Sequence, residues 1–128
     1  MERTHFEQAK IWLESAKETA LKENREKYSV GIAMLIHSVI KANDALTMKF
    51  LNTTAKRHDD AKVLFQELIK RNFIKAEYSN YKDIIQEAIN NKAKAEYRAG
   101  YFSKNDFDDL LRKSEKFIKM CKEVLIYE

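Results

Sequence analysis

The sequence contains no proline, only two glycines, Gly31 and Gly100, and a single cysteine, Cys121, among its 128 residues. Proline breaks helices and glycine weakens them, so nothing in this composition prevents long helices, and little of it favours the turns of an all-β fold. One cysteine cannot form a disulfide within the chain, and its place on an apolar stripe predicts a core residue. Length and composition predict an all-α protein with one domain over residues 1–128.

Long apolar runs and a charge of one sign are also lacking. No stretch reaches the roughly 20 apolar residues of a membrane span, and the N-terminal MERTHFEQAK does not resemble a signal peptide, so we expect a cytoplasmic protein without a membrane partner. The 24 basic and 20 acidic residues give a net charge of +4, spread over the whole length. This balance is a mild bias toward anionic partners, because most of these charges are expected on salt-bridged helix surfaces.

Apolar residues recur at helical spacing in five segments, which predict helices over about residues 4–24, 28–51, 57–72, 81–98 and 103–125. Short connections favour antiparallel neighbours, so the predicted architecture is an up-and-down four-helix bundle in which the short third helix is an addition. The predicted core is the set of residues on these stripes: Phe6, Ala9, Leu13, Ala16, Ala20, Leu35, Val39, Ala42, Leu46, Phe50, Ala61, Leu64, Phe65, Leu68, Tyr81, Ile84, Ile85, Ala88, Ile89, Phe107, Leu110, Leu111, Ser114, Phe117, Ile118, Cys121 and Leu125.

Several positions predict where these helices begin and end. Thr4 with Glu7, and Ser103 with Asp106, have the spacing of capping boxes at the first and last helix. The short polar side chains of residues 52–54 predict a break after the second helix, and residues 77–80 predict a linker before the fourth. Gly100 suits the left-handed residue that ends a helix.

The sequence has no glycine-rich phosphate loop, paired-cysteine site or HExxH motif, so it predicts no metal and no cofactor. His37, Lys41 and Asp44 share one face of the second helix and could bind a phosphate or orient a partner. They lie opposite the apolar stripe, however, and an ordinary solvated face is the simpler interpretation. His5 is expected on the surface, and His58, at the start of the third helix, could turn its ring inward.

Three runs resemble the HEPN (higher eukaryotes and prokaryotes nucleotide-binding) family: HSVIKANDALTMKFL at 37–51, RHDDAKVLFQEL at 57–68 and KAKAEYRAGYFSKNDFDDLLRKSEKFI at 92–118. Within that family the chain is most similar to small prokaryotic proteins encoded beside a minimal nucleotidyltransferase. The resemblance covers nearly the whole chain in order and length, and its single motifs are soft. The matching features are the segment Asp44 to Leu46, His58, Glu96 with Tyr97, and Ser103 through Ile118.

The ribonucleases of that family use an arginine followed, after about four to six residues, by a histidine, because metal-free RNA cleavage needs a group that titrates near neutral pH and a cation for the phosphorane. This sequence departs from the pattern, since the corresponding window after every arginine holds no histidine. After Arg98 it contains Ser103, Lys104 and Asn105. The missing histidine argues against an ordinary HEPN ribonuclease. It also argues against a partner nucleotidyltransferase modifying a tyrosine that adjoins the arginine–histidine motif.

The resemblance therefore implies a non-catalytic binding protein. Family members commonly form homodimers and can present a groove to a nucleotide, to RNA or to a nucleotidyltransferase, in pairs of the toxin–antitoxin kind. Cations and an aromatic ring near helix ends suit phosphate and base contacts, although a terminal tyrosine such as Tyr97 can also simply cap the core. These candidate residues are Arg57, His58, Lys94, Tyr97 and Arg98.

Two other functions stay open at this point. The first is a divergent metal-independent ribonuclease toxin in which His58 or His37 acts with Arg57 or Arg98. The second is a helical bundle that binds another protein and nothing else.

Overall fold

A computed structural model describes residues 1–96 and 101–126 of the chain. Within these residues the protein is an all-α bundle with five α-helices, one 3₁₀ helix and no strand, which confirms the predicted fold class. No helix in the described ranges combines the length and apolarity needed to cross a membrane. The elements are α1 (Glu2–Thr19), α2 (Lys27–Leu51), α3 (His58–Lys70), the 3₁₀ helix η1 (Ala76–Tyr81), α4 (Lys82–Glu96) and α5 (Lys104–Leu125).

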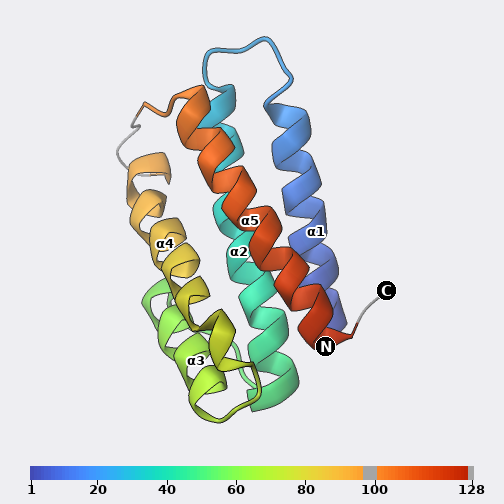
Figure 1. The fold of residues 1–128 in the computed structure, drawn as a ribbon. Coiled ribbons are helices and arrows are strands. Elements are labelled where there is room, and N and C mark those ends of the chain that lie inside the picture. The colour runs from blue at the N-terminus through green and yellow to red at the C-terminus, as the bar shows by residue number, and fades with distance from the viewer. Residues whose placement is uncertain (97–100, 127–128) are drawn as a thin grey trace.

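The long helices α1, α2, α4 and α5 run alternately up and down, and α3 lies beside the lower half of the bundle (Figure 1). The central helix is α2, which packs against α1, α3, α4 and α5. Most predicted core residues are buried in one cluster. Five others are half-buried against it: Ala20, Phe50, Tyr81, Ile89 and Leu111. The predicted core residue Leu64 is only half-buried. Two buried polar contacts of α2 tie its neighbours to it: Ser38 Oγ donates to the Ala9 carbonyl at 2.8 Å, and Asn43 Nδ2 donates to the Ala61 carbonyl at 3.0 Å.

The capping box predicted for α5 is confirmed. Ser103 Oγ accepts from the Asp106 amide at 3.1 Å, and the Asp106 carboxylate accepts from the Ser103 amide at 2.9 Å. The box predicted at Thr4 is wrong, because α1 already begins at Glu2 and Thr4 lies inside its first turn. An acidic residue in the first turn favours this earlier start, since its charge complements the helix dipole.

Three other predicted boundaries need correction. The first helix ends at Thr19 rather than near residue 24, and the following turn is held by Asn24, whose Oδ1 accepts from the Glu26 amide at 2.8 Å. Residues 77–80 belong to η1 instead of an irregular linker, and Tyr81 ends η1 rather than starting α4. The break after α2 is confirmed, with Asn52 in the left-handed conformation at φ 55°. The predicted cap Gly100 lies outside the described residues.

Gly31 explains how α5 approaches α2 closely near the upper end of the bundle. A Cβ atom at this position would lie 2.6 Å from Cε1 of Phe107, well inside van der Waals contact. The Phe107 ring is buried and packs beside Tyr28, with ring centroids 5.9 Å apart, so it has little room to move away. The absence of a side chain at Gly31 therefore sets the distance between the two helices here.

Candidate functional site

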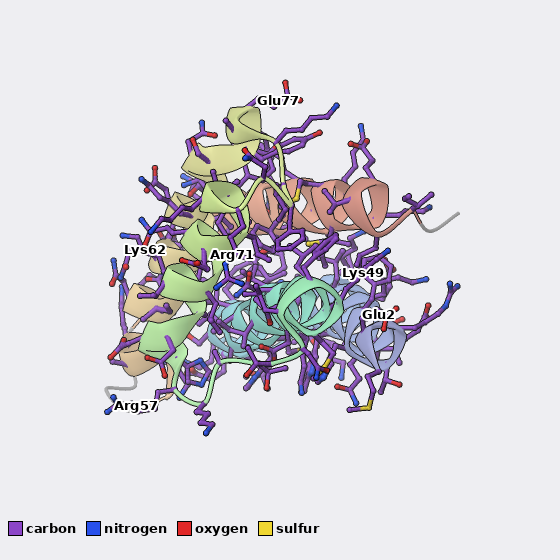
Figure 2. The ribbon with its side chains drawn as sticks, turned by 90° about the horizontal axis from the view of Figure 1, so that it is seen from below. Glu2, Lys49, Arg57, Lys62, Arg71 and Glu77 are labelled. Atoms are coloured by element: carbon purple, nitrogen blue, oxygen red, sulfur yellow. The ribbon has the colours of Figure 1, made fainter. Side chains whose placement is uncertain are left out.

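One side of α2 is covered by a segment of irregular chain and not by a helix of the described ranges. Viewed from below, α1, α3, α4 and α5 are arranged around the other sides of α2, and residues 52–57 pass along the remaining side on their way to α3 (Figure 2). Arg57 lies at the outer end of that segment and points away from the bundle (Figure 2). His37, Ile40, Lys41 and Asp44 share this side of α2, because they are spaced by three and four residues along a helix.

Asp44 is buried beneath this segment, with only 7 % of its surface exposed. Burial raises the pKa of its carboxyl group to about 6, and it outweighs the opposing effects of the Lys41 ammonium and of a hydrogen bond that the carboxylate accepts from the Ala55 backbone. The other carboxylate oxygen, Oδ1, is buried without a hydrogen-bond partner among the described residues. The expectation that Asp44 belongs to an ordinary solvated face is therefore wrong, because a helical wheel cannot show that the chain returns over this side.

His37 contacts α1 on the same side, and the charge of Lys41 acts on His5 of that helix. The His37 ring stacks on the Trp12 ring, with centroids 4.9 Å apart and planes inclined by 27°. Both His37 and His5 are half-buried, so the expectation of a simple surface position for His5 is also wrong. Burial lowers the pKa of His5, and the nearby charges of Lys41 and of the N-terminal ammonium lower it further.

The first residue of α3 completes the group. Ile40, Ala55, Lys56, Arg57 and His58 line a small pocket of about 80 Å³ between α2 and the 52–57 segment. His58 is half-buried with its Nδ1 atom inside, as the sequence suggested. We call the surface formed by His5, Trp12, His37, Lys41, Asp44, Lys56, Arg57 and His58 the histidine face. It brings together all three histidines of the sequence.

The other predicted site residues do not join this face in the described parts of the chain. Lys94 lies in the last turn of α4, and its ammonium stands 4.4 Å from the centroid of the Phe102 ring. Tyr97 and Arg98 lie outside the described residues. Sequence reasoning missed Trp12 altogether, although the one tryptophan of the chain lies seven residues after His5 and hence on the same side of α1.

The chemistry available at the histidine face is that of binding a negatively charged group. Lys41, Lys56 and Arg57 supply permanent positive charge, and Trp12 supplies an aromatic surface. The only carboxylate in the group, Asp44, is buried, and with a pKa of about 6 it is largely ionised at neutral pH, so it offsets one of these three positive charges. In the described ranges no three His, Cys, Asp or Glu side chains are grouped so that they could hold a metal ion.

The single thiol does not contribute to this site. Cys121 is buried in the core, as predicted, and burial raises the pKa of its thiol well above the usual value. A group that stays protonated and out of contact with solvent is a poor nucleophile.

No family model matches this sequence, and comparison with curated proteins also gives no match.

Proposed function

We propose that the chain is a non-catalytic, HEPN-like binding protein that takes a phosphate-bearing ligand, a nucleotide or RNA, at the histidine face and works with a minimal nucleotidyltransferase. The observation that supports the ligand class is the collection of three histidines, two lysines, an arginine and a tryptophan on one side of α2. Cations recognise phosphate, and an aromatic ring offers a stacking surface to a base. The nucleotidyltransferase rests on the family resemblance alone.

The positions of the cations support phosphate binding in two ways. Arg57 is exposed at the N-cap of α3, and the first amide groups of a helix favour an anion. Lys41 is half-buried on α2, so its charge is less screened than that of a fully exposed lysine. A phosphate placed between them would meet both charges. Asp59 and Asp60 in the first turn of α3 oppose this attraction, which favours a ligand that lies toward α2.

Binding of single-stranded RNA and of ATP to the full chain, measured by fluorescence anisotropy over a range of salt concentrations, tests the ligand class. Arg57→Ala and Lys41→Ala should each weaken binding several-fold and reduce the slope of log K against log salt by about 1. Arg25→Ala is the matched control, because Arg25 is 92 % exposed in the connection at the opposite end of α2 and the change in net charge is the same. Equal losses in all three variants, or no binding by the wild type, would contradict the proposed site.

A ribonuclease activity is the second candidate, and one observation favours it. All three histidines and Lys41 lie on the same side of α2, so a general acid, a general base and a cation are available within one surface. Purified protein incubated with RNA and a chelator distinguishes the two functions. If the protein cleaves RNA and the cleavage disappears in His37→Ala or His58→Ala, the enzymatic function replaces the binding proposal. If the RNA stays intact and binds measurably, the result supports the binding proposal.

The partner is tested separately from the ligand. A nucleotidyltransferase encoded next to this chain should co-purify with it when both are expressed together. If the neighbouring genes encode none and none is recovered, the pairing is abandoned, while ligand binding at the histidine face can still hold.

A further inference from the structure

Asp44 puts a buried carboxylate into the part of the histidine face that is proposed to bind phosphate. This carboxylate accepts a hydrogen bond from the Ala55 backbone, and Ala55 lines the small pocket that Arg57 also lines. Lys41, the other cation proposed to hold the phosphate, lies one helical turn earlier on the same side of α2, and its charge acts on Asp44. A phosphate between Lys41 and Arg57 would therefore lie close to the Asp44 carboxylate.

One oxygen of this carboxylate has no donor to balance it. Oδ1 of Asp44 is buried and accepts no hydrogen bond within the described parts of the chain. Two anions held close together in a poorly solvated place repel each other, and the repulsion is relieved when one of them takes up a proton. The diester phosphates of RNA stay ionised far below neutral pH, so the carboxyl group is the one that accepts it. The proton would sit on Oδ1, because the other oxygen accepts from Ala55.

With Asp44 ionised, the side-chain charges around it cancel. The titratable and charged groups on the neighbouring elements are the N-terminal ammonium and His5 at α1, His37 and Lys41 on α2, and Lys56, Arg57, His58, Asp59 and Asp60 from the 52–57 segment into the first turn of α3. The side chains among them include three permanent cations, and Asp44 brings the carboxylates to three, so with neutral histidines these charges sum to zero. Protonation of Asp44 leaves one positive charge in excess, and each histidine that gains a proton adds another.

We propose, on the basis of the function proposed above, that anion binding at the histidine face is coupled to proton uptake by Asp44. The face holds a phosphate-bearing ligand tightly when Asp44 is protonated and releases it more readily when Asp44 is ionised. Burial already raises the pKa of this carboxyl to about 6 in the free protein, so a further rise of about one unit on binding brings proton uptake into the range of about pH 6 to 7. Because the complex binds the proton more tightly than the free protein does, the affinity rises as the pH falls through this range.

An oligouridylate of about eight nucleotides is the probe, because neither its diester phosphates nor its bases titrate between about pH 5.5 and 8. It carries no terminal phosphate, since a phosphate monoester titrates near pH 6 and would confuse the result. In fluorescence anisotropy at fixed salt, Asp44→Asn should bind about tenfold more tightly than the wild type at about pH 8, where only the wild type carries the charge. At about pH 5.5 the two affinities should agree within about twofold.

Proton uptake is measured directly by titration calorimetry in two buffers of different ionisation enthalpy. Near pH 6.5 the wild type should take up about half a proton more than Asp44→Asn on binding the oligouridylate. Asp109→Asn is the matched control, because it loses the same charge on α5, outside the histidine face, where Asp109 pairs with Lys113 and Arg112. Its affinity and proton uptake should equal those of the wild type at every pH.

Far-UV circular dichroism checks that all three proteins are folded over the whole pH range. If the oligouridylate binds, but the ratio of the wild-type and Asp44→Asn affinities is the same at every pH, the coupling is overturned and the proposed function still holds. A change of the same size in Asp109→Asn would also overturn the coupling alone. If the oligouridylate binds at no pH, the coupling and the proposed function are both overturned.

Discussion

Asp44 provides the sharpest test of how the histidine face is built, because its carboxyl group is buried and its pKa is raised to about 6 from an ordinary value of 3.8. A raised carboxyl pKa means that the native protein binds the proton more tightly than the unfolded chain does. Its contribution to stability is therefore most favourable below about pH 4 and is lost as the pH rises through about 6. A difference of about two pKa units corresponds to a penalty of about 3 kcal/mol once the carboxyl is ionised in both states.

Asp44→Asn removes the charge and keeps an oxygen that can accept from the Ala55 backbone. We expect the variant to be more stable than the wild type by up to about 3 kcal/mol at pH 8, with the difference falling to about 1 kcal/mol near pH 4.5. Urea denaturation followed by far-UV circular dichroism at several pH values measures this difference directly.

Asp109→Asn is the control, because the carboxyl pKa of Asp109 is shifted in the opposite direction from that of Asp44. A hydrogen bond from Lys113 holds the pKa of its carboxyl below the ordinary value, with the charges of Lys113 and Arg112 acting in the same direction. Removing this charge should destabilise the protein at neutral pH, and the effect should vanish as the pH falls and the carboxyl is protonated. If Asp44→Asn were no more stable than the wild type at pH 8, or if its advantage did not shrink on acidification, the reasoning about Asp44 would be refuted.

Three further substitutions test the packing. Gly31→Ala should destabilise the protein by about 1–3 kcal/mol through its clash with Phe107, and combining it with Phe107→Leu should recover part of the loss; a stability equal to that of the wild type would contradict the close approach. Ser114→Ala should leave the thermal midpoint unchanged or raise it, because Ser114 Oγ is buried without a hydrogen-bond partner among the described residues, and a marked loss would reveal a bond that the hydroxyl makes. Ser103→Ala should cost about 1 kcal/mol, measured by urea denaturation, since it removes the acceptor for the Asp106 amide, whereas exposed Asn105→Ala should cost much less.

The helices and the core could largely be predicted from the sequence. The stripes that contain Leu35 and Phe117 have regular spacing, and the box at Ser103 is a local interaction between residues three apart. The predicted first residues of α1 and α4 were less accurate, because more than one nearby residue could have started each helix. Thr4 had a capping spacing, but α1 begins one turn earlier, and Tyr81 had core spacing with α4 but belongs to η1.

The candidate site was predicted only in part. His37, Lys41 and Asp44 were expected to share one side of α2, and they do, because a helix of 3.6 residues per turn leaves no alternative. Their surroundings could not be predicted, since the contacts of His37 with Trp12 and of Asp44 with Ala55 join residues that are far apart in the sequence or separated by a loop.

The amino-acid order alone determined that this chain forms helices, roughly where they lie and which residues they bury, because each of these properties depends on neighbours within one or two turns. Only the tertiary structure decided that residues 52–57 return across α2, burying Asp44 and bringing His58 and Arg57 to the side on which α1 presents His5 and Trp12. The path of a loop is set by how whole helices pack, and helix packing follows from surfaces that no short stretch of sequence contains.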